Sequence, residues 1–215
     1  MSKQYIFFDL DGTLAKTDSG ITASLKYSLT KFGIHAADSD LKNTIGIHLI
    51  DIYTQRFGLD QEQTKQAITH FNEYYKKHGM QGVQLFSGVK TMLQKLKAEG
   101  KTIALVTGKP IFYATQIISR FDVLHLIDFV SGTITDKINT TKQELIQNAL
   151  THFGLTDVKD VVMVGDTVPD VVGAKAHNMD LVMVTYGYGV LQNLKNAGAN
   201  IFVSSTQELT ETLLR

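Results

Sequence analysis

The stretch Tyr5-Ile6-Phe7-Phe8-Asp9-Leu10-Asp11-Gly12-Thr13 decides the interpretation of this chain. Its first four residues form a continuous apolar run, which predicts a buried strand. Asp9 and Asp11 follow at the end of that strand, and Gly12 with Thr13 indicates a sharp turn. Two like charges beside a buried strand are costly to desolvate unless positive charge lies near them. A divalent hard cation such as Mg²⁺, which prefers oxygen ligands, would supply that charge.

The same pattern also occurs in simpler structures. Asp-Gly is a common turn dipeptide, and Asp-x-Asp-Gly begins many calcium-binding loops. A calcium loop needs a Glu six residues after its glycine, whereas this chain has Asp18 at that position. A predicted strand, not a helix, also precedes the motif. The pattern therefore favours a reactive carboxylate pair over a turn or a calcium loop.

Length and composition limit the class of protein. The chain has 215 residues, of which 43% are hydrophobic, enough for one large domain or a domain with a smaller insert. Its formal net charge is zero and it contains no cysteine, which argues against nucleic acid as a partner and excludes disulfides and thiolate chemistry. No apolar stretch approaches the roughly 18 residues of a membrane helix, and no secretion signal is recognised. We expect a cytoplasmic monomer or homodimer with no membrane partner.

Apolar runs and helical patterns alternate through most of the chain. Several of the runs are continuous, as expected for strands that helices cover on both faces. This alternation predicts an α/β fold with a doubly wound parallel sheet, similar to a Rossmann fold. The predicted strands are Tyr5–Phe8, Ile103–Val106, Ile127–Val130, Val161–Val164 and Leu181–Val184.

A helical insert interrupts this alternation after the first strand. Between about Ala15 and Val83 the apolar residues recur at helical spacing, and no convincing strand is present. An insert of this length predicts a separate small bundle. We therefore expect a core domain of residues 1–14 and 84–215 and a helical domain of residues 15–83.

Polar residues follow three of the predicted strands. Asp9 and Asp11 follow the first, Thr107-Gly108-Lys109-Pro110 the second, and Gly165-Asp166-Thr167-Val168-Pro169-Asp170 the fourth. Ligands of open α/β sheets bind beyond the carboxyl ends of the strands. The prolines favour the first turn of a following helix, and a helix N-terminus attracts phosphate. The pattern predicts a site for phosphate and metal at this edge of the sheet.

Lys142 adds a possible cation to this site. Thr141-Lys142-Gln143-Glu144 fits a capping box, which places the lysine in the first turn of a helix. A cation is disfavoured there unless an anion or a carboxylate lies opposite. The alternatives are that Lys142 is a solvated surface residue, or that Lys137 in the preceding loop is the cation of the site.

Together these residues resemble the haloacid dehalogenase superfamily of phosphotransferases. Asp9-Leu10-Asp11-Gly12-Thr13 is similar to its first motif, Thr107 to its second, Lys142 to its third, and Gly165 to Asp170 to its fourth. The motifs occur in the family's order over essentially the whole chain, with a helical cap between the first and the second. The chain most resembles the phosphoglycolate-phosphatase-like branch. However, Ile45-Gly46-Ile47-His48-Leu49 stands where that branch usually carries Gly-Pro-Pro-Leu, which leaves glycolate specificity open.

The resemblance implies a mechanism and a set of site residues. Asp9 would attack phosphorus and form an aspartyl-phosphate, and Asp11 would act as acid and then as base. Thr107, Gly108 and Lys142 would hold the phosphate, with His48 of the cap as a candidate substrate contact. Mg²⁺ would be held by a set drawn from Asp9, the backbone carbonyl of Asp11, Asp166 and Asp170, where Asp170 could instead orient Lys142. The expected activity is Mg²⁺-dependent hydrolysis of a small phosphomonoester.

The same fold supports other activities. A dehalogenase would not need the proton that Asp11 can donate. A phosphonatase would need a cap lysine, for which Lys16, Lys26 and Lys31 are available. A sugar phosphomutase, similar to beta-phosphoglucomutase, would keep the same core. A non-catalytic phosphate-binding module would not need both a nucleophile and an acid, since fold alone does not determine activity.

Overall fold

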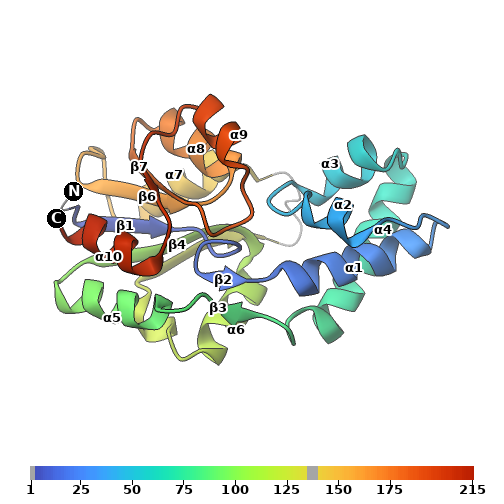
Figure 1. Ribbon diagram of the computed structural model, residues 1–215, viewed down its shortest axis with the longest axis horizontal. Coiled ribbons are helices and arrows are strands. Elements are labelled where there is room, and N and C mark those ends of the chain that lie inside the picture. The colour runs from blue at the N-terminus through green and yellow to red at the C-terminus, as the bar shows by residue number, and fades with distance from the viewer. Residues whose placement is uncertain (1–2, 135–139) are drawn as a thin grey trace. The chain divides into compact units, whose positions relative to one another are not determined.

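The computed structural model describes residues 3–134 and 140–215. The chain forms two compact units: residues up to Ala15 together with Leu85–Arg215, here called the core unit, and Lys16–Gln84, here called the helical unit. Figure 1 shows the elements of both units. Within the described ranges, no helix has both the length and the apolar composition needed to cross a bilayer.

A six-stranded parallel sheet forms the centre of the core unit, which confirms the predicted fold class. Its strand order is β5-β4-β1-β6-β7-β8. The central strand β1 pairs with β4 and β6, so that Phe8 lies opposite both Leu105 and Val164. This register brings the ends of the three strands to one edge of the sheet. The strands are β1 (Tyr5–Phe8), β4 (Thr102–Pro110), β5 (Phe129–Thr133), β6 (Val161–Gly165), β7 (Asp180–Val184) and β8 (Phe202–Val203).

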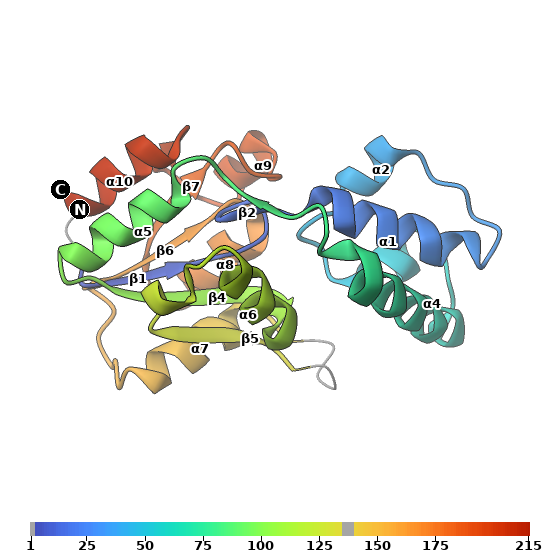
Figure 2. The ribbon, with the colours of Figure 1, turned by 90° about the horizontal axis from the view of Figure 1, so that it is seen from below.

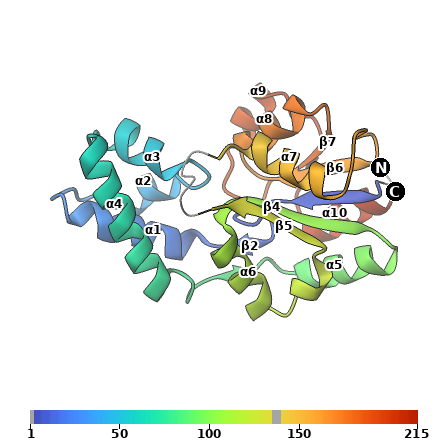
Figure 3. The same cartoon turned by 180° about the vertical axis from the view of Figure 1, so that it is seen from behind.

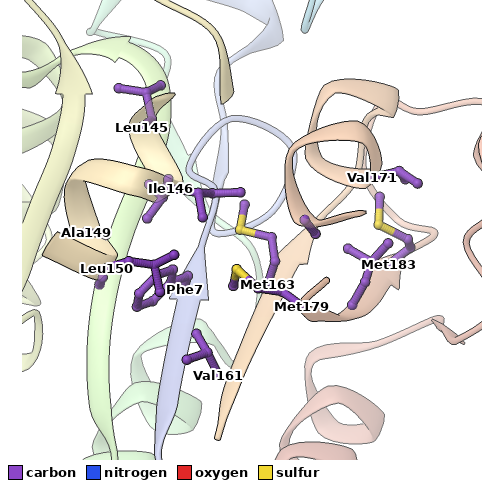
Figure 4. Close-up of a cluster of buried hydrophobic side chains, with 14 of the residues drawn as sticks. Phe7, Leu145, Ile146, Ala149, Leu150, Val161, Met163, Val171, Met179 and Met183 are labelled. Atoms are coloured by element: carbon purple, nitrogen blue, oxygen red, sulfur yellow. The ribbon is translucent and has the colours of Figure 1, made fainter. Parts of the chain in front are cut away.

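Helices cover both faces of this sheet (Figures 1 and 3). On one face lie α5 (Val89–Ala98), α6 (Ile111–Arg120) and α10 (Thr206–Leu214). On the other lie α7 (Lys142–His152), α8 (Val168–Ala176) and α9 (Leu191–Asn196). Figure 4 shows the apolar cluster between the sheet and the second group of helices, with Phe7, Ile146, Met163 and Val171 among its members. Burial on both faces explains why the strand runs are continuously apolar.

The structure corrects three details of the predicted strands. The third predicted strand, Ile127–Val130, begins two residues later and runs as Phe129–Thr133, because the short 3₁₀ turn η3 (Leu124–Leu126) precedes it. The edge strand β8 has only two residues, too few to give a recognisable pattern. The strand β4 continues past Val106 to Pro110, with an irregular register that the sequence pattern did not reveal.

The helical unit contains two long helices and several short segments, joined to the core unit by two connecting strands (Figure 2). Apolar residues such as Leu25, Leu29 and Tyr53 are fully buried within it, and the rings of Tyr27 and Tyr74 stack 4.8 Å apart. The helices are α1 (Asp18–Thr30), α2 (Asp38–Lys42), α3 (Leu49–Asp51) and α4 (Gln61–Tyr74), with π-helical segments η1 (Ile52–Arg56) and η2 (Tyr75–Gly79). The connecting strands β2 (Ala15–Lys16) and β3 (Gln84–Leu85) pair with each other.

Candidate active site

The site lies where β1, β4 and β6 end. Asp9 directly follows β1, and its amide donates to the carbonyl of Val164 on β6 at 2.9 Å. Asp166 directly follows β6, one residue beyond Gly165. The parallel register therefore brings together carboxylates that lie more than 150 residues apart in the sequence.

Three buried carboxylates form a cluster at this edge. One oxygen from each of Asp9, Asp166 and Asp170 lies within 4.8 Å of the other two. Hard cations bind such oxygen groups, so these residues could hold a divalent metal ion. The carboxylate of Asp11 is not a member of this cluster, although its backbone follows the same strand.

Lys142 binds two of these carboxylates from the first turn of α7. Its Nζ lies 2.9 Å from Oδ1 of Asp9 and 2.8 Å from Oδ1 of Asp170, and it donates to the carbonyl of Val106 at 3.0 Å. Thr141 and Glu144 form the predicted capping box, which fixes the start of the helix. Lys142 is therefore a buried cation of this site and not a solvated surface residue. Its competitor Lys137 lies outside the described residues.

The charge of Lys142 is stable in this position. Burial lowers the pKa of its ammonium group, but the carboxylates of Asp170 and Asp9 more than offset this and raise the pKa above its usual value. The carboxylates thus explain why a cation is tolerated in a first helical turn.

Asp170 is occupied by contacts within the protein. Its Oδ2 accepts hydrogen bonds from the amide and hydroxyl of Thr167, at 3.0 and 2.8 Å, and from the amide of Asp166 at 3.2 Å. Together with Thr167 it forms a capping box at the start of α8. A side chain on Gly165 would collide with this carboxylate, so the turn requires glycine. Asp170 holds both Lys142 and the turn that carries Asp166.

Asp166 is positioned by two segments distant in the sequence. The hydroxyl of Thr13 donates to its Oδ1 at 3.0 Å, and the amide of Tyr188 donates to its Oδ2 at 2.7 Å. Gly187 and Gly189 allow this close approach, because a side chain on either would overlap Asp166. The hydrogen bond from Tyr188 to Asp166 depends on tertiary structure, so a local sequence pattern does not indicate it.

Ionisation of Asp9 and Asp166 is costly because both are buried beside other carboxylates. Burial raises the pKa of Asp9 to about 6 even though Lys142 opposes the shift. Burial, together with Asp170 and Asp9, also raises the pKa of Asp166 well above its usual value. A divalent cation beside these carboxylates would offset that cost.

Lys109 is a site residue that the sequence reasoning did not single out. Its Nζ lies 3.0 Å from Oδ2 of Asp11, and its side chain is only 6% exposed. Nearby, Thr107 is buried and its hydroxyl accepts from the amide of Lys109 at 3.2 Å, while Gly108 is exposed. The sequence signal that could have identified Lys109 is its position two residues after Thr107, just beyond the predicted strand. However, the direction of its side chain, toward Asp11, depends on the irregular register of β4.

His48, the predicted substrate contact, belongs to the helical unit. It is half-buried and occupies the N-cap position of α3. Its neighbour Ile47 is 50% exposed, so this loop presents an apolar side chain to solvent.

Comparison with known proteins identifies the family. A family model described as haloacid dehalogenase-like hydrolase matches residues 6–184. A 5'-nucleotidase of Pseudomonas aeruginosa is 31% identical over 88% of this chain and 86% of its own length. Tyrosine-protein kinase PtkA of Mycobacterium tuberculosis is 29% identical, over 99% of this chain and 73% of the relative.

Phosphoglycolate phosphatase of Yersinia pseudotuberculosis is 28% identical over 85% of this chain and 81% of its own. The crystal structure of a predicted phosphatase from Clostridium acetobutylicum superposes with a TM-score of 0.94 and 35% identity, covering 100% of this chain and 99% of that one. The chain therefore belongs to the haloacid dehalogenase-like hydrolases, in the branch similar to phosphoglycolate phosphatases.

Proposed function

We propose that the protein is a Mg²⁺-dependent phosphomonoester hydrolase that acts through an aspartyl-phosphate on Asp9. The observation that carries the proposal is the arrangement of two carboxylates at the end of β1. Asp9 contacts Lys142 and belongs to the cluster of buried carboxylates, whereas Asp11 contacts Lys109. One aspartate is thus suited to nucleophilic attack and the other to proton transfer.

The charge balance supports a divalent cation in this mechanism. Among the residues that the structure describes, the ion pairs of this site set the carboxylates of Asp9, Asp11, Asp166 and Asp170 against the ammonium groups of Lys109 and Lys142, which leaves an excess of two negative charges when all four carboxylates are ionised. Asp9, Asp166 and the backbone carbonyl of Asp11 would hold Mg²⁺. The ion would reduce the repulsion between the phosphate and the carboxylates when bound.

The protein's own residues would carry out the remaining steps. Asp9 attacks phosphorus while Asp11 donates a proton to the leaving alkoxide oxygen. Thr107 and the amide of Gly108 hold phosphate oxygens, and Lys142 balances the charge of Asp9 and the phosphate. Asp11, now ionised, takes a proton from the water that attacks the aspartyl-phosphate. Hydrolysis releases phosphate and restores Asp9.

The substrate is a small phosphorylated metabolite. The names 5'-nucleotidase and phosphoglycolate phosphatase both describe phosphomonoester hydrolases, while the name tyrosine-protein kinase describes phosphoryl transfer to a protein. The groups at the end of β1 would contact the phosphate and the metal, which such reactions share, and so would not discriminate between substrates. A panel of phosphorylated metabolites assayed with Mg²⁺ would identify the preferred compound.

Variants of Asp11 test the proposed mechanism through the choice of leaving group. Asp11→Asn should lose nearly all activity on an alkyl phosphate, whose alkoxide needs a proton. On p-nitrophenyl phosphate, whose phenolate leaves with little help, the variant should release a burst of nitrophenol approaching one equivalent and then turn over slowly. Intact mass should show the trapped phosphoprotein, and Asp9→Asn should show neither phase. Equal losses on both substrates, with no burst and no phosphoprotein, would contradict these assignments.

A further inference from the structure

An irregular segment of β4 places Lys109 in the site. Val106 of β4 lies opposite Ser131 of β5, and Pro110 lies opposite Thr133, so four residue steps of β4 span two steps of β5. The segment Thr107–Lys109 therefore bulges out of the regular ladder. Bulges redirect side chains and commonly occur beside active sites.

Two contacts keep this bulge in place. The amide of Lys109 donates to the hydroxyl of Thr107 at 3.2 Å. Gly132 on β5 lies so close that a Cβ atom there would come within 2.7 Å of the carbonyl oxygen of Lys109. The backbone of Lys109 is thus held by the neighbouring strand, and its side chain is almost fully buried. Lysines are rarely buried unless they are paired.

The two carboxylate oxygens of Asp11 differ in their contacts. Its Nζ contacts Oδ2 of Asp11 at 3.0 Å. The other oxygen, Oδ1, is buried and accepts no hydrogen bond from any residue that the structure describes. A buried carboxylate oxygen normally has a partner, so an oxygen without one at a strand end is available to a ligand.

We propose that Lys109 is a positioning residue for Asp11: by holding Oδ2, it fixes the rotation of the carboxylate and leaves Oδ1 to exchange protons with the leaving group and then with water. This inference rests on the proposed function and assigns a role to a residue that none of the four family motifs includes. It predicts that Lys109 acts on the proton-transfer steps. A lysine that only bound the phosphate would instead act on every substrate alike.

Lys109→Met tests this role, with Lys101→Met as the matched control. Both lysines are 8% exposed. Lys109 lies near the C-terminal end of β4, whereas Lys101 directly precedes the first residue of that strand. The first chemical step is measured by single turnover with an alkyl phosphate and by the nitrophenol burst with p-nitrophenyl phosphate. Lys109→Met should slow the alkyl reaction about 100-fold, the effect of a misplaced catalytic group, and should change the burst rate little. Lys101→Met should leave both rates unchanged.

Two further variants separate positioning from other roles. Lys109→Arg keeps a cation opposite Asp11 and should recover most of the alkyl reaction. In an Asp11→Asn background, Lys109→Met should have no additional effect, because the residue acts through Asp11. Equal slowing of both substrates, a raised KM with unchanged kcat, or full additivity with Asp11→Asn would overturn the proposal.

Failure of this inference differs from failure of the proposed function. If the wild-type protein hydrolyses neither phosphate in the presence of Mg²⁺, the proposed function is wrong. If the wild type and Asp11→Asn behave as expected while Lys109→Met treats both substrates alike, only the role of Lys109 is wrong.

Discussion

Replacing Lys142 with methionine should lower both the stability and the activity of the protein. The ammonium group of Lys142 contacts Asp9, Asp170 and the carbonyl of Val106, all at 3.0 Å or less. Its aliphatic stem packs against α8, where a Cβ atom on Gly173 would come within 2.9 Å of it. Methionine keeps most of that packing. The substitution therefore removes mainly the charge and its contacts.

The expected loss of stability follows from the burial of Asp9 and Asp170, the two carboxylates that Lys142 contacts. Removing one member of a buried ion pair costs about 3–5 kcal/mol, because the remaining charge is left without compensation. For a protein of this size, each kcal/mol corresponds to about 2–4 °C in Tm, so Tm should fall by about 6–20 °C. The pKa of Asp9, already about 6, should rise further without Lys142. Much of the nucleophile would then be protonated at neutral pH.

The loss of stability in Lys142→Met should depend on pH, and the raised pKa of Asp9 determines the direction of that dependence. The folded-state pKa of Asp9 lies above its usual value of 3.8, so ionisation of Asp9 destabilises the fold, fully so above about pH 6. Below that pH, Asp9 in the folded protein takes up a proton, so that its carboxyl group no longer needs the charge of Lys142. The difference in Tm between the wild type and Lys142→Met should therefore be larger at pH 7.5 than at pH 5.

Thermal unfolding of metal-free protein, followed by circular dichroism, measures these differences, and Lys101→Met controls for the loss of a buried lysine elsewhere. Adding Asp170→Asn to Lys142→Met removes one of the uncompensated charges and should recover part of the lost stability without restoring activity. An unchanged Tm in Lys142→Met, or a further loss in the double variant, would refute the assignment of Lys142 as the cation that balances this cluster.

Three other expectations follow from the same geometry. Mg²⁺ should raise the Tm of metal-free protein more at pH 7.5 than at pH 5.5, because protons compete for Asp9 and Asp166, whose pKa values are raised; no shift at pH 7.5 would argue against a metal site. Asp166→Asn should weaken Mg²⁺ binding in calorimetry by at least 10-fold, and unchanged affinity would exclude Asp166 as a ligand. His48→Ala should reorder a panel of phosphorylated substrates more than it slows p-nitrophenyl phosphate, whereas the exposed His35→Ala should leave the order intact.

The sequence was most informative where one local pattern predicts both a strand or helix and the position of the site residues next to it. The apolar run before Asp9 predicts a central strand, and the runs before Thr107 and Asp166 predict strands that end at the same edge. The capping box around Lys142 likewise predicts both the start of α7 and the position of the lysine, as the structure has them. In each case the deciding residues lie within one element.

Features that depend on pairing between distant segments were not predictable in this way. The bulge that redirects Lys109 results from the register between β4 and β5, and its sequence continues a strand without any visible break. The hydrogen bond from Tyr188 to Asp166 joins residues 22 positions apart through a glycine-lined contact. The start of β5 was misplaced because Ile127 is apolar and β-branched, yet it follows the turn η3 and precedes the paired residues.

Two local rules are broken at this edge of the sheet, and a single physical requirement accounts for both. Lys142 places a cation in a first helical turn, and Lys109 places one on a bulge in the sheet, where each would be disfavoured in isolation. Each cation contacts a carboxylate at the end of β1, one Asp9 and the other Asp11. The two aspartates are thus kept in different environments although only one residue separates them. The proposed reaction requires this separation, because one carboxylate must attack phosphorus while its neighbour exchanges protons.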